Sequence, residues 1–284
     1  MNQKSSHPWS RRQALLAGFA ACCGSVLGQE SPPHVRILFF GTSYTALNGL
    51  PAMVGELLLS SGLFAPHIGS YLQPGYRLEQ HSVDQAGLGL LRQGADDGQP
   101  WDVIVEQEQS LLSAAAASQD DARRIMNGGF AGLVAAARGI NPGVLAVDFQ
   151  VWARHSDLWE KKSKDALFTG ASASQALDNI RAANVNAVTA VREQSPGAQI
   201  LISPVGDFWQ QSLRRHPDLK LHAENGSHPT VVGSYLAALV IAGSIGGRGV
   251  LEKATWNGIC PADDAARLRK LVLDHPDIFK SATP

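Results

Sequence analysis

Cysteine is scarce in this sequence of 284 residues, which contains only three. Cys22 and Cys23 lie side by side near the N-terminus, and Cys260 stands alone near the other end. If the N-terminal segment is removed, no pair remains that could form an intramolecular disulfide, and no cysteine cluster remains to bind a structural metal. We therefore expect a domain that depends on its hydrophobic core.

An excess of charge of one sign is also missing. Lysine and arginine number 24 and aspartate and glutamate 25, so the formal net charge is −1. This balance gives no electrostatic reason to expect nucleic acid or an anionic membrane as a partner. Long apolar runs are missing too, since the segment 229–245 is shorter than a membrane span and contains glycine and serine. We expect no membrane span.

The N-terminus has the pattern of a targeting segment. The paired arginines Arg11 and Arg12 precede a short apolar stretch that runs from Ala14 to Leu27. Basic residues before a short apolar region are typical of a signal peptide, and twin arginines indicate the route for prefolded proteins. We predict an export signal over residues 1–28, and a periplasmic or secreted location for a single domain over 29–284. A lipid anchor at Cys22 is the less favoured alternative.

Strand and helix patterns alternate through the rest of the chain. Apolar runs indicate strands at 35–40, 67–72, 103–105, 144–149 and 199–202. Helical spacing indicates helices at 50–63, 122–138, 172–194, 229–245 and 262–273. Continuous apolar strands separated by helices predict a three-layer α/β/α sandwich with a mainly parallel, doubly wound sheet. Ligands bind such sheets at the carboxyl ends of the strands.

Two polar positions have the chemistry of a nucleophile and its base. Ser43 follows Gly41 directly after the first strand, where the chain must turn and where free amides can face an oxyanion. His228 precedes the apolar segment 229–245, and Glu224 or Asn225 lies close enough in the chain to orient its ring. Taken singly, Ser43 is more typical of a helix cap or a turn, and His228 is more typical of a surface loop.

Four segments in order resemble the motif blocks of the SGNH/GDSL hydrolase superfamily. The nucleophile block is Gly41-Thr42-Ser43, and the last block is His228-Pro229 followed by Gly233-Ser234-Tyr235-Leu236-Ala237. Between them, Gly87 fits the glycine block, and Gln107 with Ser110 matches a branch that carries Gln-x-x-Ser after the central strand. The resemblance covers about residues 35 to 245 and implies the same SGNH/flavodoxin-like sandwich.

The resemblance also implies roles for individual residues. Ser43 would attack the acyl carbon and His228 would act as general base and then as general acid. The amides of Ser43 and Gly87, with the side chain of Gln107, would form the oxyanion hole. Losing one such donor typically costs about 3–4 kcal/mol of transition-state stabilisation.

The triad acid is the main departure from the family pattern. Asn225 occupies its position, and an amide cannot stabilise an imidazolium as a carboxylate does. Glu224 is the alternative partner of His228. Thr42, which replaces the usual Asp or Asn beside the nucleophile, is a smaller departure because that residue is not the nucleophile.

We therefore expect an exported serine ester hydrolase that works through an acyl-enzyme on O-acyl groups, such as acetyl groups, of carbohydrates. The alternative is a catalytically impaired SGNH-like domain that binds glycan or another partner. A lipid-directed esterase is a third possibility, which short against long acyl substrates would separate from the first.

The remaining features predict no cofactor. The glycine-rich segment 243–249 follows a helix instead of opening one, which argues against a dinucleotide site. His216 and His222 have no metal-ligand spacing, so no metal is expected. Trp152 and Trp159, near His155, fit either a sugar-stacking rim or the core.

Overall fold

The computed structural model describes residues 31–158 and 172–281. The predicted export signal and Trp159 lie outside these residues, so the boundary between signal and domain stays a prediction. No helix in the described ranges is both long and apolar enough to cross a membrane.

A five-stranded parallel sheet forms the centre of the domain. Its strands are β1 (His34–Gly41), β2 (Ala65–Leu72), β3 (Val103–Glu106), β4 (Leu145–Phe149) and β5 (Gln199–Ser203). They lie in the order β2-β1-β3-β4-β5, and all four adjacent pairs are parallel. All five expected strands are confirmed, and 67–72 belongs to the edge strand β2. The strand order reverses between β1 and β3, which is where such sheets bind ligands.

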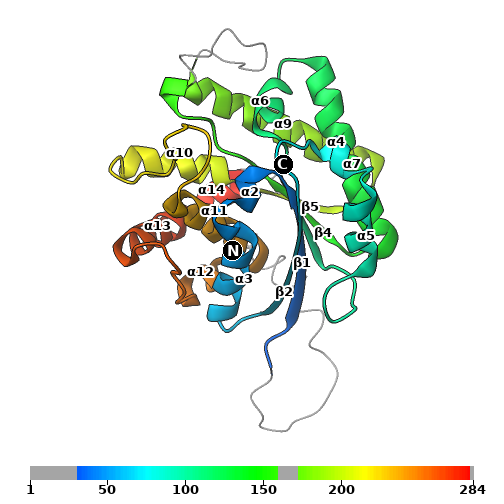
Figure 1. Cartoon of the computed structure of the whole chain (residues 1–284), viewed down its shortest axis with the longest axis horizontal. Coiled ribbons are helices and arrows are strands. Elements are labelled where there is room, and N and C mark those ends of the chain that lie inside the picture. Colours follow the sequence, from blue (N-terminus) through cyan, green and yellow to red (C-terminus); the bar gives the residue numbers. More distant parts are fainter. Residues whose placement is uncertain (1–30, 159–171, 282–284) are drawn as a thin grey trace, which may run out of the picture.

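Helices cover both faces of this sheet (Figure 1), which confirms the predicted α/β/α sandwich. One layer contains α3 (Leu50–Ser60), α10 (Val205–Arg215), α11 (Val231–Gly246), α12 (Arg248–Lys253), α13 (Ala262–Asp274) and α14 (Pro276–Ser281). The other contains α4 (Leu78–His81), α5 (Gln85–Gln93), α6 (Ser110–Ala115), α7 (Asp120–Ile140) and α9 (Ala173–Gln194). The short helix α2 (Ser43–Ala46) and the 3-10 turn Leu47–Gly49 connect β1 to α3.

The alternation of side chains along β1 explains why this strand is central. Ile37 and Phe39 pack into one core cluster, whereas Leu38 and Phe40 pack into the other, and all four are fully buried. A strand buried on both faces has a continuous apolar sequence, as β1 does from Ile37 to Phe40. Segment 229–245 forms the core helix α11, whose residues from Gly233 to Ile245 are all buried.

Two adjacent glycines in α7 have opposite environments and yield a matched test of packing. A Cβ added at Gly129 would lie 2.2 Å from the backbone nitrogen of Glu79, whereas one at Gly128 would meet nothing within 4 Å. We expect Gly129→Ala to lower the free energy of unfolding by about 1–3 kcal/mol, because α7 must move away from α4. Gly128→Ala should raise it by about 0.5–1 kcal/mol through helix propensity. Urea unfolding of both variants checks this, and equal effects would contradict it.

Candidate active site

Ser43 stands at the carboxyl end of β1, at the point where the sheet order reverses. Thr42 caps α2, since its hydroxyl accepts a hydrogen bond from the amide of Tyr44 at 3.3 Å. The first amides of a helix have no acceptor within the helix, so the Ser43 N–H is available to an oxyanion. Gly41 is required there because a Cβ would lie 2.6 Å from the Thr45 hydroxyl. The turn thus presents a half-buried Ser43 at its tip.

His228 reaches Ser43 from the other end of the chain. The two side chains are joined by a contact of 3.0 Å between Ser43 Oγ and His228 Nε2. The loop that carries His228 is closed by a bridge between His222 and Pro229. Partial burial and, secondarily, the positive charge of Arg154 lower the pKa of His228. The imidazole is therefore neutral at neutral pH, as a general base must be.

Asn225 contacts the far side of the His228 ring. Its Oδ1 accepts the backbone N–H groups of Ser227 and His228, both at 3.0 Å, which fixes the orientation of the amide. Its Nδ2 therefore faces His228 Nδ1, at 2.7 Å. Because Nδ2 can only donate, Nδ1 must accept, and the ring proton of neutral His228 lies on Nε2. This is the opposite tautomer to the one that a base for Ser43 needs. Glu224 is exposed and makes no such contact with His228 among the described residues.

An aromatic stack packs against the two segments that carry Ser43 and His228. The Tyr44 ring stacks on Trp152 at 4.6 Å between centroids, and Trp152 stacks on Trp209 at 4.1 Å. Tyr44 also contacts the Ser227 hydroxyl at 2.7 Å, and Trp152 donates to the Ser227 carbonyl at 3.1 Å. Trp152 is only 1% exposed, so the sugar-stacking interpretation is wrong for it. No motif in the sequence indicates a role for Tyr44 or Ser227, although each is adjacent to a candidate site residue, Ser43 or His228.

Gln107 is fully buried beneath the nucleophile turn. Its Oε1 accepts from the Thr42 amide and hydroxyl, both at 2.9 Å, and from the Thr45 hydroxyl at 3.0 Å. Its Nε2 donates to the carbonyl of Glu108. Through these contacts Gln107 stabilises the turn between β1 and α2. Its part in the oxyanion hole stays a prediction that depends on the second hydrogen of Nε2.

Gly87 lies in the first turn of α5, close to the end of β2. Its amide faces the Asp84 carboxylate at 3.4 Å, and a Cβ there would lie 2.7 Å from the Tyr71 ring. No described contact joins Gly87 to Ser43, so its place in the oxyanion hole likewise stays a prediction.

Three buried acids surround the ends of the central strands. Glu106 and Asp148 are register neighbours on β3 and β4, and Glu108 follows two residues later. Burial raises the pKa of Glu106 well above its ordinary value, that of Glu108 to about 8 and that of Asp148 to about 7. Neighbouring carboxylates add to each of the two glutamate shifts. These groups are structural carboxylic acids, held mainly protonated in the folded protein at mildly acid pH.

The buried acids predict that stability falls as pH rises. Their pKa values in the folded chain lie above the ordinary 3.8 and 4.5, so the folded state binds more protons than the unfolded state between about pH 4 and pH 8. The stabilisation is full below this window and is lost through it. The free energy of unfolding of Asp148→Asn minus that of the wild type should therefore be more positive at pH 8 than at pH 5. Urea unfolding at both pH values tests this, with the exposed Asp121→Asn as control, and parallel curves would contradict it.

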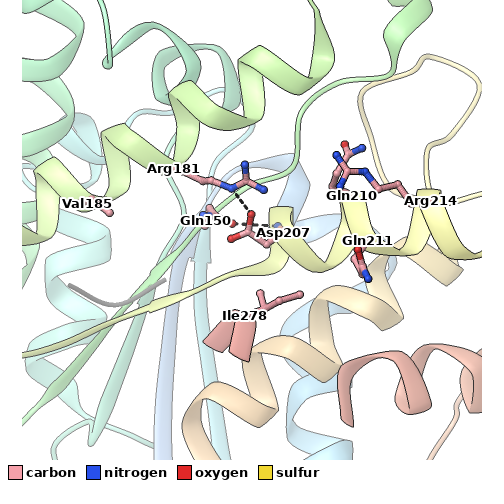
Figure 2. A pocket seen from close by; sticks show the side chains of 8 residues that line it. All are labelled: Gln150, Arg181, Val185, Asp207, Gln210, Gln211, Arg214 and Ile278. Atoms are coloured by element: carbon pink, nitrogen blue, oxygen red, sulfur yellow. Dashed lines mark hydrogen bonds and ion pairs between the residues drawn. The ribbon is translucent and has the colours of Figure 1, made fainter. Parts of the chain in front are cut away.

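Two cavities of the described surface are lined by neither Ser43 nor His228. One of about 260 Å³ is lined by Arg154, His155 and His222, among others. The other, of about 320 Å³, lies between α9 and α10. Figure 2 shows its polar lining, with Arg181 paired to Asp207 beside Gln150. None of the predicted site residues lines this second cavity.

Comparison with solved structures identifies the fold. A DUF4886 family protein from Bacteroides uniformis covers 85% of this chain and 94% of its own, with a TM-score of 0.61 and 18% identity. A protein from Slackia heliotrinireducens described as an SGNH hydrolase covers 74% of this chain and 97% of its own, with a TM-score of 0.51 and 26% identity. This chain has the SGNH hydrolase fold.

A third protein with the SGNH fold agrees with this result. It comes from Parabacteroides merdae, is described as a GDSL-like lipase, and matches with a TM-score of 0.52 and 13% identity over 77% of this chain and 99% of its own. The chain matches no protein-family model and no curated protein sequence. The SGNH resemblance drawn from the motif blocks is therefore confirmed at the level of fold, while the branch with the Gln-x-x-Ser block stays a prediction.

Proposed function

We propose that this chain is an exported serine ester hydrolase that acts through an acyl-enzyme at Ser43. The observation that carries the proposal is the 3.0 Å contact between Ser43 Oγ and His228 Nε2, which joins residues 185 positions apart at the ligand-binding edge of the sheet. The resemblance to the SGNH/GDSL family and the fold comparison support the same class of reaction.

The mechanism follows from the residues at this contact. The ring proton of His228 first moves from Nε2 to Nδ1, and the Ser43 hydroxyl then gives its proton to Nε2 while Oγ bonds to the acyl carbon of the ester. The amide of Ser43 faces the oxyanion that develops. The bond to the alcohol oxygen then breaks, and the alcohol takes the proton from Nε2. A water molecule repeats the sequence on the acyl-enzyme, which releases the carboxylic acid and restores Ser43.

We propose O-acyl groups of carbohydrates, in particular acetyl groups, as the substrates. This choice is supported by the predicted export and by the family resemblance, and not by the chemistry of the pocket. A preference for p-nitrophenyl acetate over long-chain p-nitrophenyl esters is expected. The reverse preference would favour a lipid-directed esterase.

One observation favours the alternative of a catalytically impaired binding domain. Asn225 holds His228 in the tautomer that carries its ring proton on Nε2, so the resting ring cannot accept the Ser43 proton. In catalysis the ring proton must move to Nδ1, and Asn225 must turn away from two backbone amides to accept it. This cost slows the reaction without removing the nucleophile or the base.

Labelling with a fluorophosphonate probe separates the two candidates. The wild type should be labelled at Ser43, and Ser43→Ala should not be labelled. The control is Ser82→Ala, since Ser82 is a half-buried serine whose hydroxyl donates to the carbonyl of Glu79, far from His228 in the chain. Labelling that persists in Ser43→Ala, or that is absent from the wild type, would remove the hydrolase proposal and leave the binding domain.

A further inference from the structure

Two histidines meet at the end of the sheet that is opposite to Ser43. His34 opens β1 and His67 lies on the neighbouring strand β2, and their rings stack with 5.0 Å between centroids. Nδ1 of His34 lies 2.7 Å from Nε2 of His67. Because β1 extends from His34 to Gly41, about 23 Å of strand separates this pair from the nucleophile turn. In Figure 1 the two places lie at opposite ends of β1.

A carboxylate completes a set of three donor atoms. Asp97 Oδ2 lies 3.7 Å from His67 Nε2, and the donor atoms of His34, His67 and Asp97 all lie within 4.8 Å of one another. Zinc bonds to imidazole nitrogen and carboxylate oxygen at about 2.0–2.2 Å, so two of its ligands lie roughly 3.4 Å apart. The observed separations lie on both sides of this value. The exposed side chain of His34 can make the small adjustment.

The surroundings of the three donors also suit a cation. Nδ1 of His67 contacts the Asp96 carboxylate, which directs Nε2 toward the other two donors. Metal-bound histidines usually have such a carboxylate partner on the second ring nitrogen. Arg36 forms ion pairs with Asp97 and Asp102. Among the described residues, no other lysine or arginine forms an ion pair with these carboxylates. Together with Asp96, the three carboxylates and one guanidinium leave a net charge of −2.

Arg36 competes with a metal ion for the Asp97 carboxylate. Its guanidinium donates to both oxygens of Asp97, and Oδ2 accepts from both Nε and Nη2. A metal ion bound to Oδ2 therefore replaces the Nη2 contact, while the contact of Nε with Oδ1 can remain. The guanidinium weakens binding of the metal without preventing it.

We propose that His34, His67 and Asp97 form a binding site for a divalent transition metal of the zinc class, which fastens the start of β1 to the edge strand β2 and to the loop before β3. Its ligands come from three segments that only the fold brings together. With three protein ligands, water would complete a four-coordinate shell. The distance from Ser43 gives the metal a structural role that is separate from ester hydrolysis.

The test is zinc binding to the full-length protein without a polyhistidine tag, measured by competition with a chromophoric chelator. One equivalent should bind, and His34→Ala and His67→Ala should each weaken binding at least about 10-fold. Asp96→Asn should weaken it less, and His216→Ala, which removes a histidine that contacts Arg267, should leave it unchanged. Zinc should raise the Tm of the wild type but not that of His67→Ala.

Cobalt(II) absorption is a second measurement, which tests the proposal even if one of the zinc-binding variants folds poorly. Cobalt(II) bound to the wild type should give visible absorption bands, and Asp97→Asn should change their position or intensity. Absence of zinc and cobalt binding by the wild type would overturn the proposal. Binding of full strength in both histidine variants would overturn it as well, because the metal would then lie elsewhere.

Discussion

Ser43→Ala and His228→Ala are each expected to slow the hydrolysis of p-nitrophenyl acetate by at least about 10³-fold, the loss seen when members of a catalytic triad are removed. Ser43 supplies the only nucleophile in contact with His228, and His228 the only base in contact with Ser43, among the described hydrogen bonds. Because both residues act in the same step, the double variant should be no slower than the slower single variant. Initial rates at several enzyme concentrations measure this.

Two kinetic results would contradict a catalytic role for Ser43 and His228. If the wild type is no faster than Ser43→Ala, hydrolysis of simple esters does not occur at Ser43, and the binding-domain alternative takes its place. If the two single losses instead multiply in the double variant, the residues act independently and the 3.0 Å contact is not catalytic. Ser82→Ala is the matched control and should keep full activity.

Asn225→Asp should raise kcat/KM by about 10²–10⁴-fold, which reverses the effect of the Asp-to-Asn change known from a serine protease. One oxygen of the introduced carboxylate can keep the backbone amides of Ser227 and His228, while the other accepts the proton on His228 Nδ1. With the ring proton held on Nδ1, Nε2 is free to take the Ser43 proton. Steady-state kinetics of the purified variant measure the gain.

Asn225→Ala is the companion variant that isolates the carboxylate. It removes the amide that donates to His228 but supplies no acceptor for the Nδ1 proton, so it should bring no comparable gain. The pair of variants therefore separates release of the wrong tautomer from stabilisation of the right one. An unchanged or lower kcat/KM in Asn225→Asp would show that the identity of residue 225 does not limit the reaction.

The strands and the long helices could be predicted because their patterns are strong. The runs at 35–40 and 144–149 are each apolar except for one residue, since β1 and β4 are largely buried on both faces. The helices α4, α5 and α6 are not predicted because each is too short for a clear helical period, and two of them depend on the caps Asp84 and Gln109. Helix α10 was also missed, although its apolar residues Phe208 and Trp209 are buried.

The pairing of Ser43 with His228 could be predicted because each residue lies within a local motif, while their roles as nucleophile and base stay predictions. What surrounds them could not, since the stack of Tyr44, Trp152 and Trp209 joins three distant segments. The tautomer of His228 depends on which backbone amides hold the Asn225 oxygen, and composition carries no sign of that. The buried state of Glu106 and Asp148 was likewise hidden, because acidic residues are almost never fully buried in proteins.

The separation of Ser43 and His228 along the chain has a consequence for biosynthesis. The nucleophile turn can form once β1 and β3 have paired, but its base is made 185 residues later and is positioned by the loop before α11. Contacts between such distant positions form late in folding, because the intervening chain must first be ordered. A polypeptide released before residue 228 therefore contains the serine but no base for it. If Ser43 and His228 act as proposed, incomplete translation products of this protein therefore lack hydrolytic activity.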